Sequence, residues 1–141
     1  MKSFHILLVE DNEGDILLTT EALEDGKIMN RTTVIKDGKS AIDFLEQTSL
    51  INELPDLVLL DVNLPKKNGH EVLQHIKQHD KLKCLPVIML TTSSSDKDIK
   101  LSYESHANCY ITKPVDAIDF IEAVTKIEDF WINIVQLPKR K

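Results

Sequence analysis

Residues 57–61 read Leu-Val-Leu-Leu-Asp, a run of four apolar residues that ends on a carboxylate. An apolar run without polar alternation is typical of a strand that is covered on both faces, as in parallel sheets. Other strand-like runs lie on either side of it, near residues 4–10, 31–36, 86–91 and 108–112. Amphipathic stretches separate these runs, near residues 13–26, 38–51, 69–79, 95–106 and 116–134. The alternation predicts an α/β fold with a parallel sheet.

Three of the predicted helices carry capping residues at their starts. The pairs are Asn68 with Glu71, Ser95 with Asp98, and Asp116 with Asp119. In each pair the first side chain can accept a hydrogen bond from a free N–H group of the first turn. The acid three residues later complements the positive end of the helix dipole.

Length and composition indicate a single globular domain. The chain has 141 residues, which suits one hydrophobic core. Its net charge of -6 argues against a nucleic-acid partner, because phosphate binding needs a basic surface. No apolar stretch approaches the roughly 18 residues of a membrane span, and no signal-peptide pattern precedes the first strand. We therefore expect no membrane association and a cytoplasmic location.

Reactive side chains stand at the ends of four predicted strands. Glu10 and Asp11 follow the apolar run of residues 6–9 in the first strand, and Asp61 ends the central strand. Thr91 ends the strand near 86–91, and Lys113 follows the last strand. The carboxyl ends of parallel strands share one edge of the sheet, where such folds bind ligands. We therefore expect all five side chains to meet in one cleft.

Three carboxylates in one cleft would repel one another, by about 1 kcal/mol per pair at roughly 4 Å in water and about 4 kcal/mol at an effective dielectric constant of 20. A hard divalent cation relieves this repulsion, and Mg²⁺ suits it because it prefers oxygen ligands and completes its shell with phosphate oxygens. Asp61 is then the candidate nucleophile for a phosphoryl group. Lys113 and Thr91 would contact the phosphoryl oxygens.

Each of these residues has an ordinary structural explanation when it is taken alone. Asp61 could cap a turn, Thr91 could be a β-former, and Lys113 could be a solvated loop residue. Glu10 and Asp11 could complement a helix dipole. These separate explanations do not account for the presence of all five residues, with suitable chemistry, at one edge of the sheet.

Four stretches of the chain resemble the receiver domain of two-component response regulators. They are residues 8–12 (LVEDN), 59–65 (LLDVNLP) with 68–69 (NG), 87–91 (VIMLT) and 110–114 (YITKP). The resemblance implies a flavodoxin-like, doubly wound, five-stranded parallel sheet in the order 2-1-3-4-5, with helices on both faces. It also implies a phosphoacceptor switch that is not an enzyme beyond slow self-phosphorylation and autodephosphorylation, with a sensor histidine kinase as its partner.

The resemblance implies a role for each site residue. Asp61 would be the phosphoacceptor, with Thr91 and Lys113 as phosphate contacts. Mg²⁺ would be bound by Asp11, Asp61 and the backbone carbonyl of Asn63, and Glu10 would act through a metal-bound water. Tyr110 would be the aromatic residue that swings inward when Thr91 is drawn to the phosphate, so that the signal reaches the surface of the last helix–strand–helix segment.

The end of the chain is more apolar than one buried helix face requires. We expect Ile118, Ile121, Val124 and Ile127 to form the core stripe of the last helix. The apolar residues in surplus are Phe120, Phe130, Trp131, Ile134, Val135 and Leu137. Those from Phe130 onward predict a protein interface, because aromatic residues are enriched at interfaces. The alternative is that the tail folds back over the edge of its own sheet.

Residues 127–138, with 108–113 and 63–67, resemble one subgroup of receivers, the small single-domain regulators associated with bacterial phytochromes. This resemblance implies a phytochrome-type sensor and a homodimer built on the last strand, the last helix and the C-terminal extension. We expect residues 1–131 to form the receiver domain and 132–141 the extension, with no separate output domain.

Three other functions compete with this interpretation. An aspartate-nucleophile phosphatase also uses a strand-end Asp with Mg²⁺, but it needs a second Asp two residues later as general acid, and Asn63 cannot transfer that proton. A nucleotide- or flavin-binding module would need a glycine-rich phosphate turn, whereas residues 10–15 are acidic. An inert adaptor would not require the complete set of acids, Thr and Lys.

Overall fold

Five parallel strands form the centre of the protein in the computed structural model, which describes residues 4–26 and 30–138. The last three residues of the predicted extension lie outside the described residues. The strands are β1 (Phe4–Val9), β2 (Asn30–Ile35), β3 (Leu57–Leu60), β4 (Val87–Thr91) and β5 (Cys109–Thr112). Their order in the sheet is β2-β1-β3-β4-β5, and each neighbouring pair is parallel. The predicted fold and strand order are confirmed.

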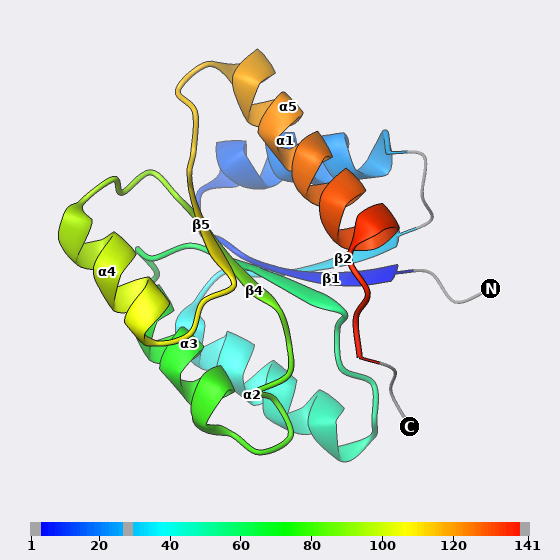
Figure 1. The fold of residues 1–141 in the computed structure, drawn as a ribbon, viewed down its shortest axis with the longest axis vertical. Coiled ribbons are helices and arrows are strands. Elements are labelled where there is room, and N and C mark those ends of the chain that lie inside the picture. The colour runs from blue at the N-terminus through cyan, green and yellow to red at the C-terminus, as the bar shows by residue number, and fades with distance from the viewer. Residues whose placement is uncertain (1–3, 27–29, 139–141) are drawn as a thin grey trace.

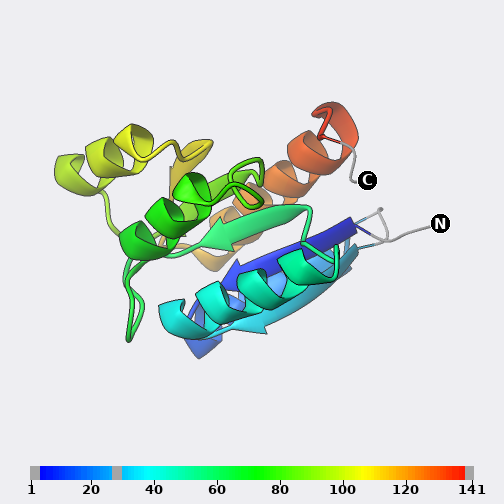
Figure 2. The ribbon, with the colours of Figure 1, turned by 90° about the horizontal axis from the view of Figure 1, so that it is seen from below.

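Helices cover both faces of the sheet (Figure 1). They are α1 (Glu13–Glu24), α2 (Gly38–Leu50), α3 (Gly69–Gln78), α4 (Asp96–Glu104) and α5 (Ala117–Glu128), and α5 continues into a π-helical segment η1 (Asp129–Ile134). α1 and α5 lie together on one face, while α2 and α3 pack on the other, with α4 beside α3 near β5 (Figures 1 and 2). Within the described ranges, no helix combines the length and the apolar character needed to cross a membrane.

The continuous apolar run of β3 is explained by two core layers, one on each face of the sheet. Val58 and Leu60 pack in the layer beneath α2 and α3, whereas Leu57 and Leu59 pack in the layer beneath α1 and α5. All four side chains are fully buried. Burying one such side chain contributes about 1.5–3 kcal/mol, so β3 anchors both layers at once. Its rigid position fixes the residue that follows it.

The predicted helix caps are present and bring α3 close to the end of β3. Asn68 and Glu71 form a reciprocal capping box, in which Asn68 Oδ1 accepts from Glu71 N at 3.0 Å and Glu71 Oε1 accepts from Asn68 N at 3.2 Å. Ser95 and Asp116 also accept hydrogen bonds from the first turns of their helices. A Cβ atom on Gly69 would lie 2.1 Å from the carbonyl oxygen of Asp61, so only glycine permits this approach.

The prediction for α5 is wrong at two positions. Ile118, which we expected in the core stripe, is 68% exposed, and Phe120, which we expected in surplus, is only 3% exposed. Val124 and Ile127 are buried as predicted. Residues 120, 124 and 127 follow the spacing of one helix face, and that face meets α1 and the sheet. The sequence was compatible with burial of either Ile118 or Phe120. The packing of α5 against α1 and the sheet places Phe120 inside.

The apolar tail is divided between the core and the surface. Trp131 is half-buried and packs against the core layer of α1 and α5. The prediction that Trp131 is in surplus is therefore wrong. Phe130 is 49% exposed and Ile134 is 61% exposed. Val135 and Leu137 are half-buried. The exposed members leave an apolar surface at the end of the last helix.

Candidate functional site

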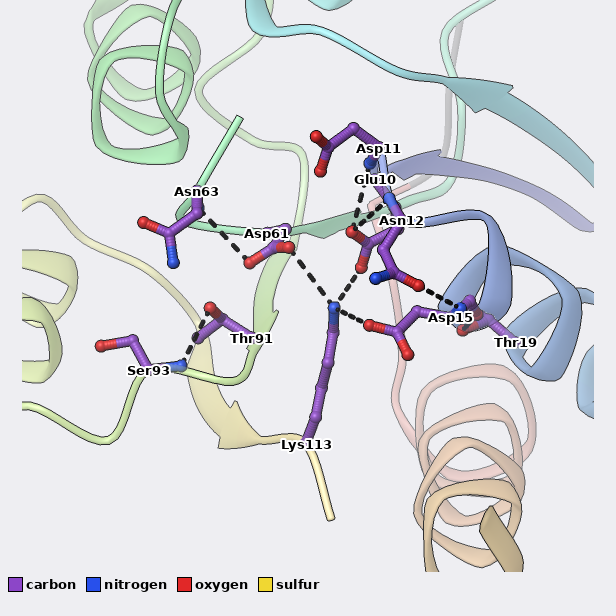
Figure 3. Close-up of polar contacts among 10 residues, drawn as sticks. All are labelled: Glu10, Asp11, Asn12, Asp15, Thr19, Asp61, Asn63, Thr91, Ser93 and Lys113. Carbon is purple, nitrogen blue, oxygen red and sulfur yellow. Dashed lines mark hydrogen bonds and ion pairs between the residues drawn. The ribbon is translucent and has the colours of Figure 1, made fainter. Parts of the chain in front are cut away.

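The predicted site residues meet at the carboxyl edge of the sheet (Figure 3). Backbone hydrogen bonds continue past the strand ends, from Asp61 N to Val9 O at 3.1 Å and from Lys113 N to Thr91 O at 2.7 Å. These bonds hold the residues that follow the strands in register. Glu10, Asp61, Thr91 and Lys113 are buried, while Asp11 is exposed at the mouth of the site.

The Lys113 ammonium lies at the centre of the site and contacts three carboxyl groups. It donates to Glu10 Oε1, to Asp15 Oδ2 at 2.9 Å and to Asp61 Oδ2 at 3.4 Å. Burial opposes the charge on the ammonium, but these three partners outweigh burial and raise the pKa of Lys113 above its usual value. Lys113 is therefore a fixed positive charge beside Asp61.

Glu10 is held by its own loop as well as by Lys113. Its Oε2 accepts hydrogen bonds from the backbone N–H groups of Asp11 at 3.1 Å and Asn12 at 3.2 Å. Burial raises the pKa of the Glu10 carboxyl to about 7, against the opposing effect of the hydrogen bond from Lys113 and with a further contribution from Asp61. Glu10 therefore changes its charge near neutral pH. A cation bound there in addition to the Lys113 ammonium would favour the ionised form of Glu10.

The three predicted acids fit a divalent cation. Within the described part of the chain, Glu10, Asp11 and Asp61 form the one group of three or more potential ligands in which one ligand oxygen from each residue lies within 4.8 Å of the others. Oxygens bound at about 2.0–2.1 Å in an octahedron stand roughly 3–4 Å apart, so only small side-chain movements would arrange the three acids around one ion, directly or through a bound water. Asn63 is also adjacent, because its backbone N–H donates to Asp61 Oδ1 at 3.4 Å.

A second group of contacts runs from Thr91 toward the surface. Thr91 is fully buried, and its Oγ1 accepts a hydrogen bond from Ser93 N at 3.3 Å. The Tyr110 hydroxyl donates to Ser93 O at 2.8 Å, and Tyr110 N donates to the Tyr103 hydroxyl of α4 at 3.1 Å. Burial raises the pKa of the Tyr110 hydroxyl, so it stays protonated as a donor. Ser93 thus connects Thr91 with Tyr110.

Asp15 is a site residue that the sequence reasoning missed. It lies in the first turn of α1, and its carboxylate points toward Lys113 (Figure 3). The sequence feature that could have indicated Asp15 is an acid in the first turn of a helix that starts at the carboxyl edge of the sheet. By contrast, the tail residues predicted as an interface lie at the far end of α5, away from the site (Figure 1).

The site and the fold match a known family. A model of the response regulator receiver domain matches residues 6–125. The response regulator Rcp1 from Synechocystis is 45% identical over 135 residues, which cover 94% of this chain and 92% of Rcp1. The probable methanogenesis regulatory protein FilR2 from Methanothrix harundinacea is 42% identical over 131 residues, which cover 92% of this chain and 84% of FilR2.

Solved structures agree in fold over nearly the whole chain. The phosphorylated cyanobacterial phytochrome response regulator RcpA superposes with a TM-score of 0.93 at 42% identity, covering 98% of this chain and 100% of RcpA. The Mn²⁺-bound form of Rcp1 superposes with a TM-score of 0.90 at 45% identity, covering 96% of this chain and 99% of that structure.

Proposed function

This chain belongs to the response regulator receiver domain family, and we propose that it is a phosphorylation-controlled switch in which Asp61 accepts a phosphoryl group from a sensor histidine kinase. The observation that carries the proposal is the position of Asp61. It is a buried carboxylate at the end of the central strand, with the Lys113 ammonium 3.4 Å away and two further acids beside it. Such a site can accept a phosphoryl group and balance its charge.

In the proposed transfer, a carboxylate oxygen of Asp61 forms a bond to phosphorus. The bond between phosphorus and the donor atom breaks, and its electron pair leaves with the donor. Lys113 would pair with one phosphoryl oxygen, and the Thr91 hydroxyl would donate to another. A divalent cation, proposed as Mg²⁺ on Asp11, Asp61 and the Asn63 carbonyl with Glu10 acting through a water, would offset the charge that develops there.

We propose that the site retains the phosphoryl group and does not turn it over rapidly. The position two residues after Asp61 holds Asn63, and a carboxamide cannot supply the proton transfer that an aspartate-nucleophile phosphatase needs. At most, slow self-phosphorylation and autodephosphorylation are therefore expected. A long-lived adduct suits a switch, because its effect persists after the kinase has left.

The proposed output runs through Thr91, Ser93 and Tyr110. Movement of the Thr91 hydroxyl toward a phosphoryl oxygen would release Ser93 N, and Ser93 O is the acceptor of the Tyr110 hydroxyl. Tyr110 N in turn contacts α4 through Tyr103. Phosphorylation would thus shift the population of conformations at the surface formed by α4, β5 and α5.

The proposed partners follow from the relatives and from the tail. RcpA is a phytochrome response regulator, and this similarity supports a phytochrome-type sensor kinase as the partner of this chain. The proposed location is the cytoplasm. The exposed side chains of Phe130 and Ile134 support a homodimer at the end of α5. We further propose that residues 1–131 are the receiver and 132–141 an extension that contributes to this interface.

The test is phosphorylation by a small acyl phosphate with Mg²⁺, followed by intact mass measurement. We expect one phosphoryl adduct on the wild type and none on Asp61→Asn. Asp80→Asn is the matched control, since Asp80 is an acid with a fully exposed side chain away from the site, and it should be modified like the wild type. Absence of an adduct with both acyl phosphate and phosphohistidine donors, or an adduct that persists in Asp61→Asn, would contradict the proposal.

A further inference from the structure

Lys113 makes one contact that the receiver chemistry described above does not use. An ammonium has three N–H donors. In this protein they face three acids, Glu10, Asp15 and Asp61. Glu10 and Asp61 belong to the group of acids that fits a cation, whereas Asp15 does not. Asp15 is therefore the one partner of Lys113 that a metal and a phosphoryl group would leave in place.

The backbone holds Asp15 firmly in position. Its N–H donates to Oδ1 of the helix cap Asn12 at 2.9 Å, and its carbonyl oxygen accepts from Thr19 Oγ1 at 2.7 Å. The side chain is 24% exposed, and that of Lys113 is 2% exposed. The first turn of α1 thus presents a fixed carboxylate to a buried ammonium that has little access to water.

Phosphoryl transfer would redistribute the partners of Lys113. When Glu10 and Asp61 turn to the cation and the phosphoryl group, Lys113 loses the two acids that now hold it in the cleft. A buried ammonium without a partner is costly, so until a phosphoryl oxygen pairs with it the side chain would move toward water unless another acid retained it. Asp15 lies at 2.9 Å, close enough to retain it without any movement.

We propose that Asp15 is a positioning residue for phosphoryl transfer, which keeps the Lys113 ammonium beside Asp61 while Glu10 and Asp61 engage the metal and the phosphoryl group. This role rests on the proposed function. Asp15 touches neither the phosphoryl group nor the metal, and it acts through Lys113. It follows that Asp15 affects the transfer step at saturating Mg²⁺ and leaves the Mg²⁺ requirement almost unchanged.

The kinetic test compares Asp15→Ala with Glu13→Gln, which removes a negative charge from the same turn at an exposed residue paired with Lys36. At saturating Mg²⁺ we expect Asp15→Ala to lower the rate constant of phosphorylation by acyl phosphate about tenfold, as for one charge-assisted hydrogen bond. The Mg²⁺ concentration for half-maximal rate should change less than about twofold, and Asp15→Glu should recover part of the rate. Glu13→Gln should behave as the wild type.

A double-mutant cycle with Lys113→Met tests whether Asp15 acts through Lys113. In the Lys113→Met background we expect Asp15→Ala to have no further effect. A second readout is the NMR signal of the Lys113 ammonium with Mg²⁺ and beryllium fluoride bound. Slow exchange with water should preserve this signal in the wild type and in Glu13→Gln, and Asp15→Ala should abolish it.

Several results would overturn the inference. They are an unchanged rate in Asp15→Ala, an equal loss in Glu13→Gln, an equal loss in the Lys113→Met background, and a preserved ammonium signal in Asp15→Ala. If Lys113→Met is too slow to measure, the ammonium signal decides alone. Phosphorylation of the wild type separates this inference from the proposed function, because a wild type that accepts no phosphoryl group contradicts the function itself.

Discussion

Glu10 makes the stability of the metal-free protein depend on pH near neutrality. Burial raises its pKa from the ordinary value of 4.5 to about 7. Between these values the folded protein holds a proton on Glu10 that the unfolded chain has already released. The folded state then binds more protons, so the free energy of unfolding falls as the pH rises. The contribution of Glu10 is complete below about pH 4.5 and is lost as the pH passes through about 7.

The expected size follows from the same two values. Their difference corresponds to about 3–4 kcal/mol, at about 1.4 kcal/mol per pKa unit. This is a large part of the stability of an ordinary domain, which is about 5–15 kcal/mol. A cation that binds the ionised form should offset the loss, because any ligand of the folded state stabilises it.

The assay is urea unfolding in the presence of a chelator at several pH values from about 5 to 8, followed by the fluorescence of Trp131, the single tryptophan. Glu10→Gln is the control, because it keeps the shape of the side chain and cannot ionise. We expect the stability difference between variant and wild type to change by about 2–3 kcal/mol over this range, in favour of the variant at high pH. Mg²⁺ should stabilise the wild type more at about pH 8 than at about pH 5. If the free energies of unfolding of the two proteins depend on pH in the same way, the reasoning is refuted.

Three further predictions concern the output, the tail and the core. Tyr110→Phe removes the hydroxyl that donates to Ser93 O. It should leave the Asp61 adduct intact and reduce the change in partner or dimer affinity on phosphorylation. An unchanged response would assign Tyr110 to packing alone. Ile134→Glu should shift the protein toward the monomer in light scattering with and without beryllium fluoride. Leu50→Glu, at a more exposed apolar residue on α2, should not. Equal effects of the two substitutions would exclude the tail interface. Phe120→Ala should lower the free energy of unfolding, measured in urea, by about 3–5 kcal/mol, and Ile118→Ala should lower it by less than about 0.5 kcal/mol. Similar losses for the two variants would contradict the burial seen in α5.

Local sequence carried much of the information about the fold. The apolar run before Asp61 predicted a strand buried on both faces, and β3 is fully buried. The capping residues Asn68, Ser95 and Asp116 predicted three helix starts, and each side chain accepts the expected hydrogen bonds. These features depend on neighbours within a few residues, so they can be recognised in the chain.

The candidate site was predictable to the extent that a parallel sheet places strand ends together. Glu10, Asp61, Thr91 and Lys113 are each next to a strand end, and the topology brings them to one edge. Asp15 was not predictable in this way, because it lies in a helix and meets Lys113 across 98 positions of the chain. Its position depends on the angle at which α1 leaves β1.

The strands, the helix starts and the set of reactive groups at the carboxyl edge could be predicted from the chain, because these follow from apolar runs, caps and the rules of parallel sheets. Tertiary packing selected the side of α5 that is buried, since Ile118 and Phe120 exchange roles when the helix turns about its axis. It also decided that the Lys113 ammonium has a third acid beside Glu10 and Asp61. Both depend on how whole helices pack against the sheet, and that packing is set by the shapes of many distant side chains together.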